Sequence, residues 1–153
     1  ILRDSSSGSG QSLPDDSSIS SPLPEGVYSG TVDCDTTTID AFGRVSTQTI
    51  PLAVTYEISD RGIPIVQGQE IRVGRTVTIG GLSGTYTRIQ PTRNGIVVHS
   101  DSTIRVGDSS ASGIGIWELR TTTTEDLEVR QTLGVVDDTG GSLNQACAGM
   151  LSP

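Results

Sequence analysis

The chain of 153 residues has the length of one domain with a leader, and its ten basic residues, all arginine, face 18 acidic ones for a formal net charge of −8. This acidic balance repels phosphate backbones and argues against nucleic acid as a partner. The sequence has no lysine, which excludes Schiff-base, phosphate-loop and isopeptide chemistry, since each needs an ε-amine.

Residues 1–26 are predicted to form an extended N-terminal arm, because Ser, Gly, Asp and Pro leave too little apolar surface for this segment to fold alone. Its apolar residues Leu13, Ile19 and Leu23 are all odd-numbered, so an extended chain would present them on one face. The chain begins at Ile1 and has no 18-residue apolar run, which predicts a processed mature product without membrane insertion, with a cloned fragment as the alternative.

Residues 27–153 are predicted to form one all-β domain, since short alternating runs of Ile, Val, Leu and Thr are separated by turn signals. The Asn94-Gly95 pair predicts a tight hairpin in which both residues take positive φ. Eight to ten strands at this spacing favour an antiparallel up-and-down barrel or a two-sheet sandwich. The expected strands are residues 27–34, 36–40, 44–50, 52–59, 63–73, 76–81, 82–90, 95–106, 113–123, 126–136 and 144–151.

The two cysteines, Cys34 and Cys147, lie near the two ends of the predicted domain. An even pair in a small exported protein indicates a disulfide, whereas a cytosolic protein would keep both thiols reduced. Disulfide geometry would place the first and last strands side by side, which favours closure into a barrel without exposed edges. The cysteines therefore predict an extracellular or cell-surface location.

The segments GVYSGTVDC and ACAGML carry a resemblance to small bacterial secreted or lipid-anchored barrels of lipocalin-like form. In those proteins a G-x-Y-x-G-T strand opens the domain, and a cysteine near the end closes it. The resemblance covers about residues 26 to 151 and implies a barrel that carries a small apolar ligand.

Candidate catalytic groups are few. His99 is the only histidine, and strand alternation sends His99 and Asp101 to one face and Ser100 to the other, so a triad among these neighbours is not expected. Asp137 and Asp138 are calcium candidates, although turn formation and solubility also explain them and no D-x-D-x-D-G loop is present. We predict no cofactor and no enzymatic activity, with a secreted hydrolase as a third interpretation.

Trp117 lies in GIGIWELR, which is apolar at successive positions and indicates a strand covered on both faces. Trp117 is therefore expected either in the core or as an anchor against a partner.

The main functional prediction is a non-enzymatic exported subunit that assembles with copies of itself through the arm, using Leu13, Ile19 and Leu23. Head-to-tail docking of this kind propagates into a filament or surface layer, which resembles the donor-strand assembly of bacterial surface fibres. An arm folded back on its own domain is the alternative. The rival function is a monomeric barrel that binds a small apolar ligand, tethered to a membrane by the leader. Glycans are further predicted partners, through O-linkage to the many Ser and Thr residues.

Overall fold

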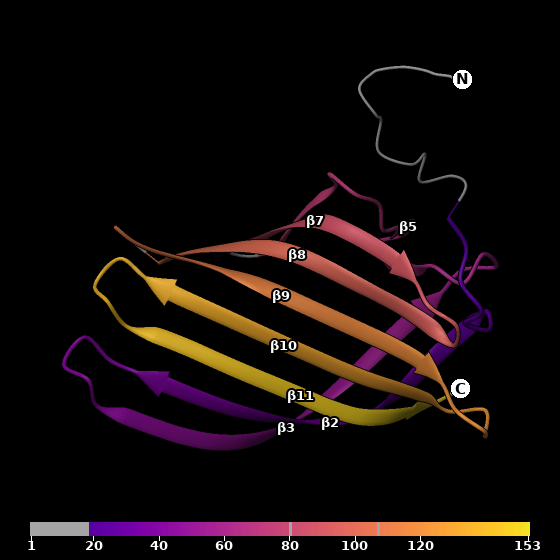
Figure 1. Ribbon diagram of the computed structural model, residues 1–153, viewed down its shortest axis with the longest axis horizontal. Helices are drawn as coiled ribbons and strands as arrows, with labels where there is room; N and C mark the ends of the chain where they lie inside the picture. The colour runs from indigo at the N-terminus through magenta and orange to yellow at the C-terminus, as the bar shows by residue number, and fades with distance from the viewer. Residues whose placement is uncertain (1–18, 80, 107) are drawn as a thin grey trace.

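The computed structural model describes residues 19–79, 81–106 and 108–153, and these residues form one antiparallel sheet of ten strands (Figure 1). The prediction of an all-β antiparallel fold is confirmed. No helix long and apolar enough to cross a membrane is found in the ranges described. The strands are β2 (Gly26–Ile39), β3 (Val45–Ile58), β4 (Pro64–Val66), β5 (Gln69–Glu70), β6 (Thr76–Ile79), β7 (Leu82–Pro91), β8 (Gly95–Val106), β9 (Ser109–Thr121), β10 (Leu127–Asp137) and β11 (Ser142–Ser152).

The strand order is β5-β4-β3-β2-β11-β10-β9-β8-β7-β6, so the cysteine-bearing strands β2 and β11 are neighbours at the middle of the sheet. The two strands that end this order, β5 and β6, are not paired with each other in the described ladders. In the described residues the expected closure is therefore replaced by a single curled sheet, or half-barrel, without the second sheet of a sandwich. Arg75 bridges the two edges, because its guanidinium donates to the carbonyls of Val66 and Gln69.

Several predicted strands merge or divide. The expected pairs 27–34 with 36–40 and 44–50 with 52–59 are single strands of 14 residues each, β2 and β3. Pro51 does not interrupt β3, which keeps its register with β2 from Val45 to Ile58. The expected strand 63–73 divides into β4 and β5, because Gln67 and Gly68 both take positive φ and form a two-residue hairpin turn.

The Asn94-Gly95 pair joins β7 to β8 as a hairpin, but neither residue has positive φ, so the predicted turn conformation is wrong. Glycine is required at position 95 for another reason. A Cβ atom there would lie 1.8 Å from the carbonyl oxygen of Leu119 on the neighbouring strand. Close strand approach, and not φ, selects this glycine.

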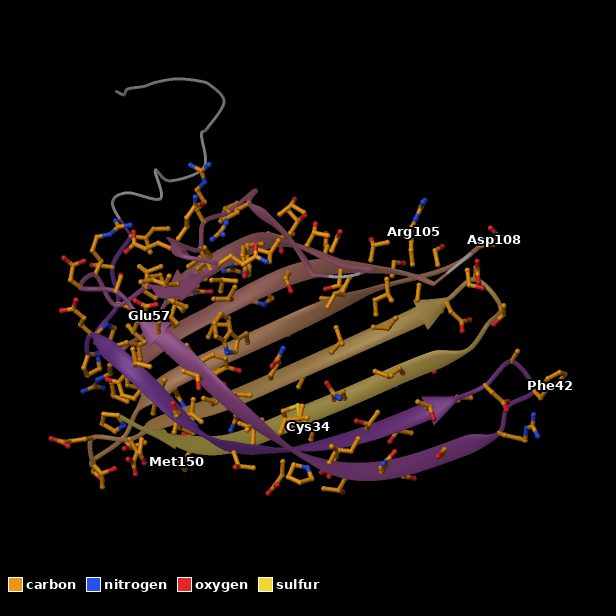
Figure 2. The ribbon with its side chains drawn as sticks, turned by 180° about the vertical axis from the view of Figure 1, so that it is seen from behind. Cys34, Phe42, Glu57, Arg105, Asp108 and Met150 are labelled. Carbon is orange, nitrogen blue, oxygen red and sulfur yellow. A yellow bond between two sulfur atoms is a disulfide. The ribbon has the colours of Figure 1, made fainter. Side chains whose placement is uncertain are left out.

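The core occupies one end of the curl, which we call the closed end. Inward-facing residues of the strands meet one another there, and residues 19–25 and 59–75 cover them (Figure 1). At the other end, the open end, the hairpin tips near Phe42 and Asp108 are splayed apart (Figure 2). The core cluster consists of Leu23, Tyr28, Val32, Cys34, Ile58, Ile63, Ile71, Ile89, Ile96, Val98, Leu119, Leu127, Val129, Cys147 and Leu151.

β9 departs from the expectation of a strand covered on both faces. Leu119 is fully buried and Trp117 packs against the core on the inner face, whereas Ile114 and Ile116 are exposed on the outer face. Inward and outward side chains therefore alternate regularly along β9, and Ile114 and Ile116 form an uncovered apolar strip on its outer face.

Candidate functional site

The inner face of the half-barrel encloses a cavity of about 370 Å³ between strands from both edges of the sheet. None of its lining residues carries a charge. The lining combines three aromatic rings with aliphatic and small polar side chains: Tyr56, Val66, Val77, Leu82, Gly84, Tyr86, Val98, Ser100, Ser102, Trp117 and Gln131.

Strand alternation places these side chains. On β8, Val98, Ser100 and Ser102 follow one another at every second position, and each contributes to the lining. Trp117 on β9 lies opposite Val98, and Gln131 on β10 lies opposite Trp117, so one row of cross-strand neighbours forms the floor.

One polar atom of Trp117 is enclosed by the protein itself. Its indole nitrogen Nε1 is buried and has no hydrogen-bond partner among the residues described. A buried donor left without an acceptor costs about 1–3 kcal/mol. The Tyr56 hydroxyl is close enough for its interaction with the indole N–H to lower the pKa of Tyr56 in part.

Tyr56 fixes the orientation of the indole from the opposite side of the curl. The two ring centroids are 5.1 Å apart at an interplanar angle of 65°, which is an edge-to-face contact. Burial raises the pKa of Tyr56, an effect that the nearby Trp117 indole offsets in part. Burial also raises the pKa of Tyr86, so both phenols are neutral donors at ordinary pH.

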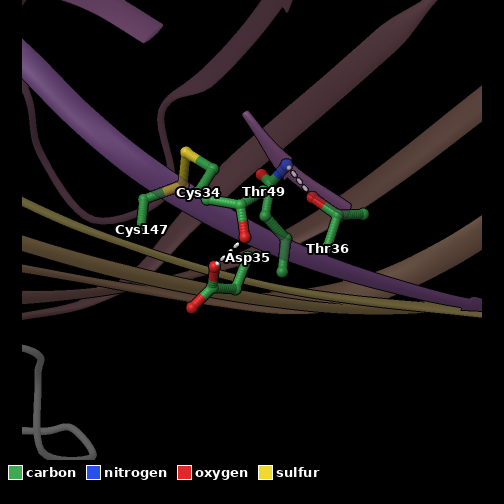
Figure 3. The surroundings of a disulfide bond; sticks show 6 residues. Cys34, Asp35, Thr36, Thr49 and Cys147 are labelled. Carbon is green, nitrogen blue, oxygen red and sulfur yellow. Dashed lines mark hydrogen bonds between the residues drawn. A yellow bond between two sulfur atoms is a disulfide. The ribbon is translucent and has the colours of Figure 1, made fainter. Parts of the chain in front are cut away.

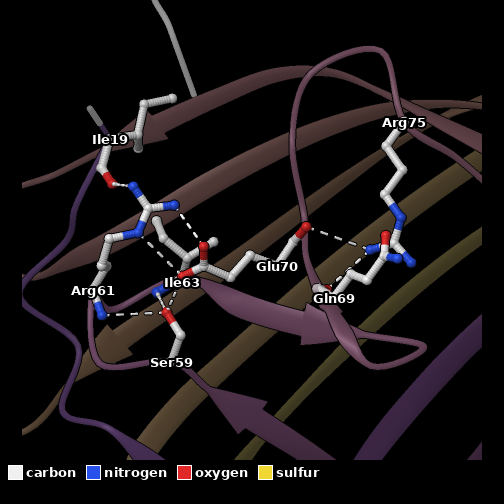
Figure 4. Close-up of polar contacts among 7 residues, drawn as sticks. All are labelled: Ile19, Ser59, Arg61, Ile63, Gln69, Glu70 and Arg75. Atoms are coloured by element: carbon white, nitrogen blue, oxygen red, sulfur yellow. Dashed lines mark hydrogen bonds and ion pairs between the residues drawn. The ribbon is translucent and has the colours of Figure 1, made fainter. Parts of the chain in front are cut away.

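The described part of the predicted arm, residues 19–25, lies against its own domain. Leu23 is buried in the core and Ile19 packs beside it. Arg61 donates to the carbonyl of Ile19 (Figure 4). The backbone N–H of Ser21 donates to the carbonyl of Arg61 at 2.9 Å. The alternative of an arm folded back on its domain therefore describes this segment. Leu13 lies outside the described residues.

Arg61 also holds Glu70, at 2.6 Å between Nη2 and Oε1, and the hydroxyl of Ser59 donates to the same carboxylate (Figure 4). The hydrogen bonds from Arg61 and Ser59 lower the pKa of Glu70 below its usual value of 4.5. This cluster joins the loop after β3 to β5 and supports the arm, so it is a structural clamp of the closed end.

The predicted disulfide between Cys34 and Cys147 is present, and it links residues directly opposite each other with Cα atoms 4.0 Å apart. Asp35 projects to the outer face, where its carboxylate accepts from Thr49 Oγ1 at 2.7 Å (Figure 3). On the inner face, Gln145 donates to Thr36 Oγ1 (Figure 3). The bond indicates folding in an oxidising environment.

His99 and Ser100 point to opposite faces, as alternation predicts, because Ser100 lines the cavity and His99 lies outside it opposite Ile116. His99 Nδ1 is buried without a hydrogen-bond partner among the described residues. The structure therefore does not assemble these side chains into a nucleophile and base.

Asp137 and Asp138 accept hydrogen bonds from different segments of the chain. Asp137 Oδ1 accepts from the backbone N–H groups of Thr139 and Gly141, at 2.9 and 2.7 Å, and from the Thr139 hydroxyl. These bonds lower the pKa of Asp137. Asp138 instead accepts from the N–H of Ser110. Within the described ranges no group of three metal-ligating side chains gathers here or elsewhere.

No family model matches the sequence, and comparisons with curated proteins and with solved structures find no match. The geometry of the fold and its cavity is therefore the basis of the functional argument.

Sequence reasoning identified Trp117 as a residue of interest but missed its partners. Tyr56 and Tyr86 lie on β3 and β7, which are far apart in the strand order. The available signal was the scarcity of aromatic residues, since three of only five aromatic side chains meet at this cavity.

Proposed function

We propose that this protein binds a small, uncharged, largely apolar ligand in the cavity of its half-barrel. The observation that carries the proposal is a cavity whose lining holds three aromatic side chains and no charged one. The volume of about 370 Å³ lies at the lower end of the range for small-molecule sites.

The lining defines the chemistry of the ligand. Tyr56, Tyr86 and Trp117 favour a ring that can stack or meet them edge to face. Ser100 and Gln131 offer hydrogen-bond donors to a ligand acceptor such as a carbonyl or ether oxygen. A charged ligand would lose its hydration without an opposite charge to replace it.

Trp117 is the only tryptophan, so its fluorescence reports on this cavity alone. We expect the neutral probe N-phenyl-1-naphthylamine to quench Trp117 emission saturably, and native mass spectrometry of the purified protein to reveal a retained small molecule. The absence of both signals would overturn the proposal.

A matched pair of variants tests the location. Gly84 lines the cavity, and a Cβ atom there would meet its nearest neighbour at 3.7 Å, so Gly84→Leu should fill the space without backbone strain. Gly134→Leu is the control. Position 134 on β10 lies between the inward-facing Leu133 and Val135, so its side chain projects to the outer face, away from the cavity. Loss of quenching only in Gly84→Leu supports the site, and equal binding by both variants contradicts it.

A second proposal is assembly outside the cell through the arm, as the sequence predicts. Ile19 and Leu23 pack on their own domain, so the contact with a neighbouring copy would come from residues 1–18. Deletion of residues 1–18 keeps this packing. Negative-stain imaging should show filaments for the full chain and separate domains after the deletion, and unchanged filaments would refute the role of the arm.

A further inference from the structure

The inner face of the half-barrel holds a second pocket, between the cavity and the tips of the open-end hairpins. This open-end pocket has a volume of about 440 Å³, and its floor is apolar. Ile104 of this pocket follows Ser102 of the cavity at the second position on β8, and Val135 follows Gln131 at the fourth position on β10, so both pockets lie on one face. The floor consists of Ile104, Ala111, Val135 and Leu143.

The cavity opens on the side of this second pocket. Leu82, which lines the cavity, lies directly opposite Ile104, which lines the open-end pocket. Exposure rises in the same direction, because Val98 in the cavity is 2% exposed whereas Leu82 is 41% exposed. The two pockets therefore meet at β7 and β8, and we call them together the trough.

The opposite side of the cavity is closed by the bridge between the two sheet edges. The guanidinium of Arg75 donates to the carbonyls of Val66 and Gln69, and Val66 itself lines the cavity. Hydrogen bonds to a charged donor of this kind are among the stronger ones in proteins. A bound molecule that is longer than the cavity would therefore extend toward the open end, where it breaks no hydrogen bond of the protein.

The trough has the length of an extended chain. Trp117 and Ala111 lie near its two ends on β9, and the six residues between these positions span roughly 20 Å at about 3.3 Å each. The cavity lining carries no charge, and the charged residues of the open-end pocket are Asp40, Arg44 and Asp137. Charge is therefore confined to the outer end of the trough.

We propose that the ligand is an aromatic ring joined to a long, uncharged alkyl chain, with the ring in the cavity and the chain along the trough. This inference rests on the proposed function of the cavity and names the class of its ligand. The ring meets Tyr56, Tyr86 and Trp117. The chain covers the apolar floor of the open-end pocket, so each methylene that becomes buried should raise the affinity about fourfold.

The open-end pocket also determines the chemistry of the chain end. Two carboxylates, Asp40 and Asp137, line it with one guanidinium, Arg44, and the whole chain has a formal net charge of −8. A carboxylate at the chain end would therefore be repelled. Thr38 and Ser46 line the same pocket, and their hydroxyls can both donate to and accept from a neutral hydroxyl group.

Three uncharged probes test the length of the site: phenylethanol, phenylhexanol and phenyldodecanol, each with its hydroxyl at the far end of the chain. Isothermal titration calorimetry with the full chain should show an affinity that rises at each step, because only the longest probe reaches the open-end pocket. Equal affinities for phenylhexanol and phenyldodecanol, or no binding of phenyldodecanol, would overturn the inference. The proposed function fails as well only if N-phenyl-1-naphthylamine also gives no signal.

Ala111→Phe places a ring in the open-end pocket, because Ala111 is half-buried and lines that pocket but not the cavity. Ser112→Phe is the control, since the next residue of β9 is exposed on the outer face. Ala111→Phe should weaken phenyldodecanol at least tenfold and leave phenylethanol within twofold, and Ser112→Phe should affect neither. Unchanged binding of phenyldodecanol by Ala111→Phe, or an equal loss for both probes, would contradict the placement of the chain.

Phenyldodecanoate tests the chain end in the wild-type protein. It shares the ring and chain of phenyldodecanol but ends in a carboxylate. At neutral pH and low salt we expect it to bind at least tenfold more weakly than the alcohol, and added salt should narrow the difference because it screens exposed charges. Equal affinities at low salt would overturn the assignment of an uncharged chain.

Discussion

The closed and open ends of the half-barrel share one alternation of side chains, but their inward faces meet different surroundings. At the closed end, inward residues such as Tyr28, Leu119 and Leu151 contact one another across the curl and are buried. At the open end, the equivalent positions of β2 and β3 hold Thr38, Gln48 and other polar residues. An alternating pattern therefore predicts a strand, whereas a core also needs something for the inward face to contact.

Removal of the Cys34–Cys147 disulfide gives the largest expected loss of stability. The double variant Cys34→Ala with Cys147→Ala should lower the free energy of unfolding by about 4 kcal/mol, because the cysteines are 113 residues apart and the chain-entropy term for such a loop is large. Urea denaturation measures the loss. Amide exchange should rise first in the open-end hairpins, and uniform acceleration would mean that the two ends unfold as one unit.

Leu151 and Leu143 compare the two ends directly, because both are leucines on the inner face of β11. Leu151 is fully buried at the closed end, so Leu151→Ala should cost about 3 kcal/mol. Leu143 is half-buried at the open end, so Leu143→Ala should lower the free energy of unfolding by at most about 1 kcal/mol. Chemical denaturation of both variants checks the difference, and equal losses would show that the open end is as tightly packed as the closed end.

Gly62 tests how residues 19–25 contribute to the closed end. Its φ is +75°, and a Cβ atom there would lie 2.3 Å from the carbonyl oxygen of Ser21. Gly62→Ala should cost about 2 kcal/mol and speed amide exchange at Ser21, because the segment must move. Gly68→Ala is the control, since Gly68 has a similar φ of +77° with no atom within 4 Å. A cost equal to the control would show that the contact with Ser21 adds nothing.

Glu70 gives a smaller, pH-dependent effect at the closed end. Its pKa is lowered by Arg61 and Ser59, so its contribution is complete above the usual value of 4.5 and is lost as the pH falls through the lowered pKa. Glu70→Gln should therefore destabilise the protein by about 1 kcal/mol at neutral pH, given the partial exposure of the pair. The difference from wild type should vanish in acid, which thermal melts across the pH range can follow.

Asp40 is the matched carboxylate at the open end. Hydrogen bonds from Arg44 and Phe42 lower its pKa as well, but the side chain is on the exposed surface. Asp40→Asn should change the stability less than Glu70→Gln at every pH. A larger effect would reverse the ranking of the two ends.

The sequence predicts the all-β class, most strand positions and the disulfide, because each depends on local alternation or on the pairing of only two cysteines. The number of strands and the open edge are less accessible. Pro51 looks like a strand boundary in the sequence, yet a proline is tolerated within β3 once its nitrogen faces an unpaired edge. That orientation depends on register, which the sequence alone does not specify.

The cavity is less predictable than the fold, because it depends on the curl of the whole sheet. Tyr56 and Trp117 come from β3 and β9, which have β2, β11 and β10 between them in the strand order. No local pattern relates two such positions. The same holds for Leu23, whose parity in the arm indicates a strand face but whose contacts are with the core of its own domain.

The pairing of β2 with β11 also brings the two boundaries of the domain together, since Ser29 lies opposite Ser152. A short linker between these boundaries, with new termini opened in the exposed turn around Phe42, would give a circular permutant that retains every ladder of the sheet. The order in which the strands follow one another along the polypeptide is thus separable from their arrangement in space.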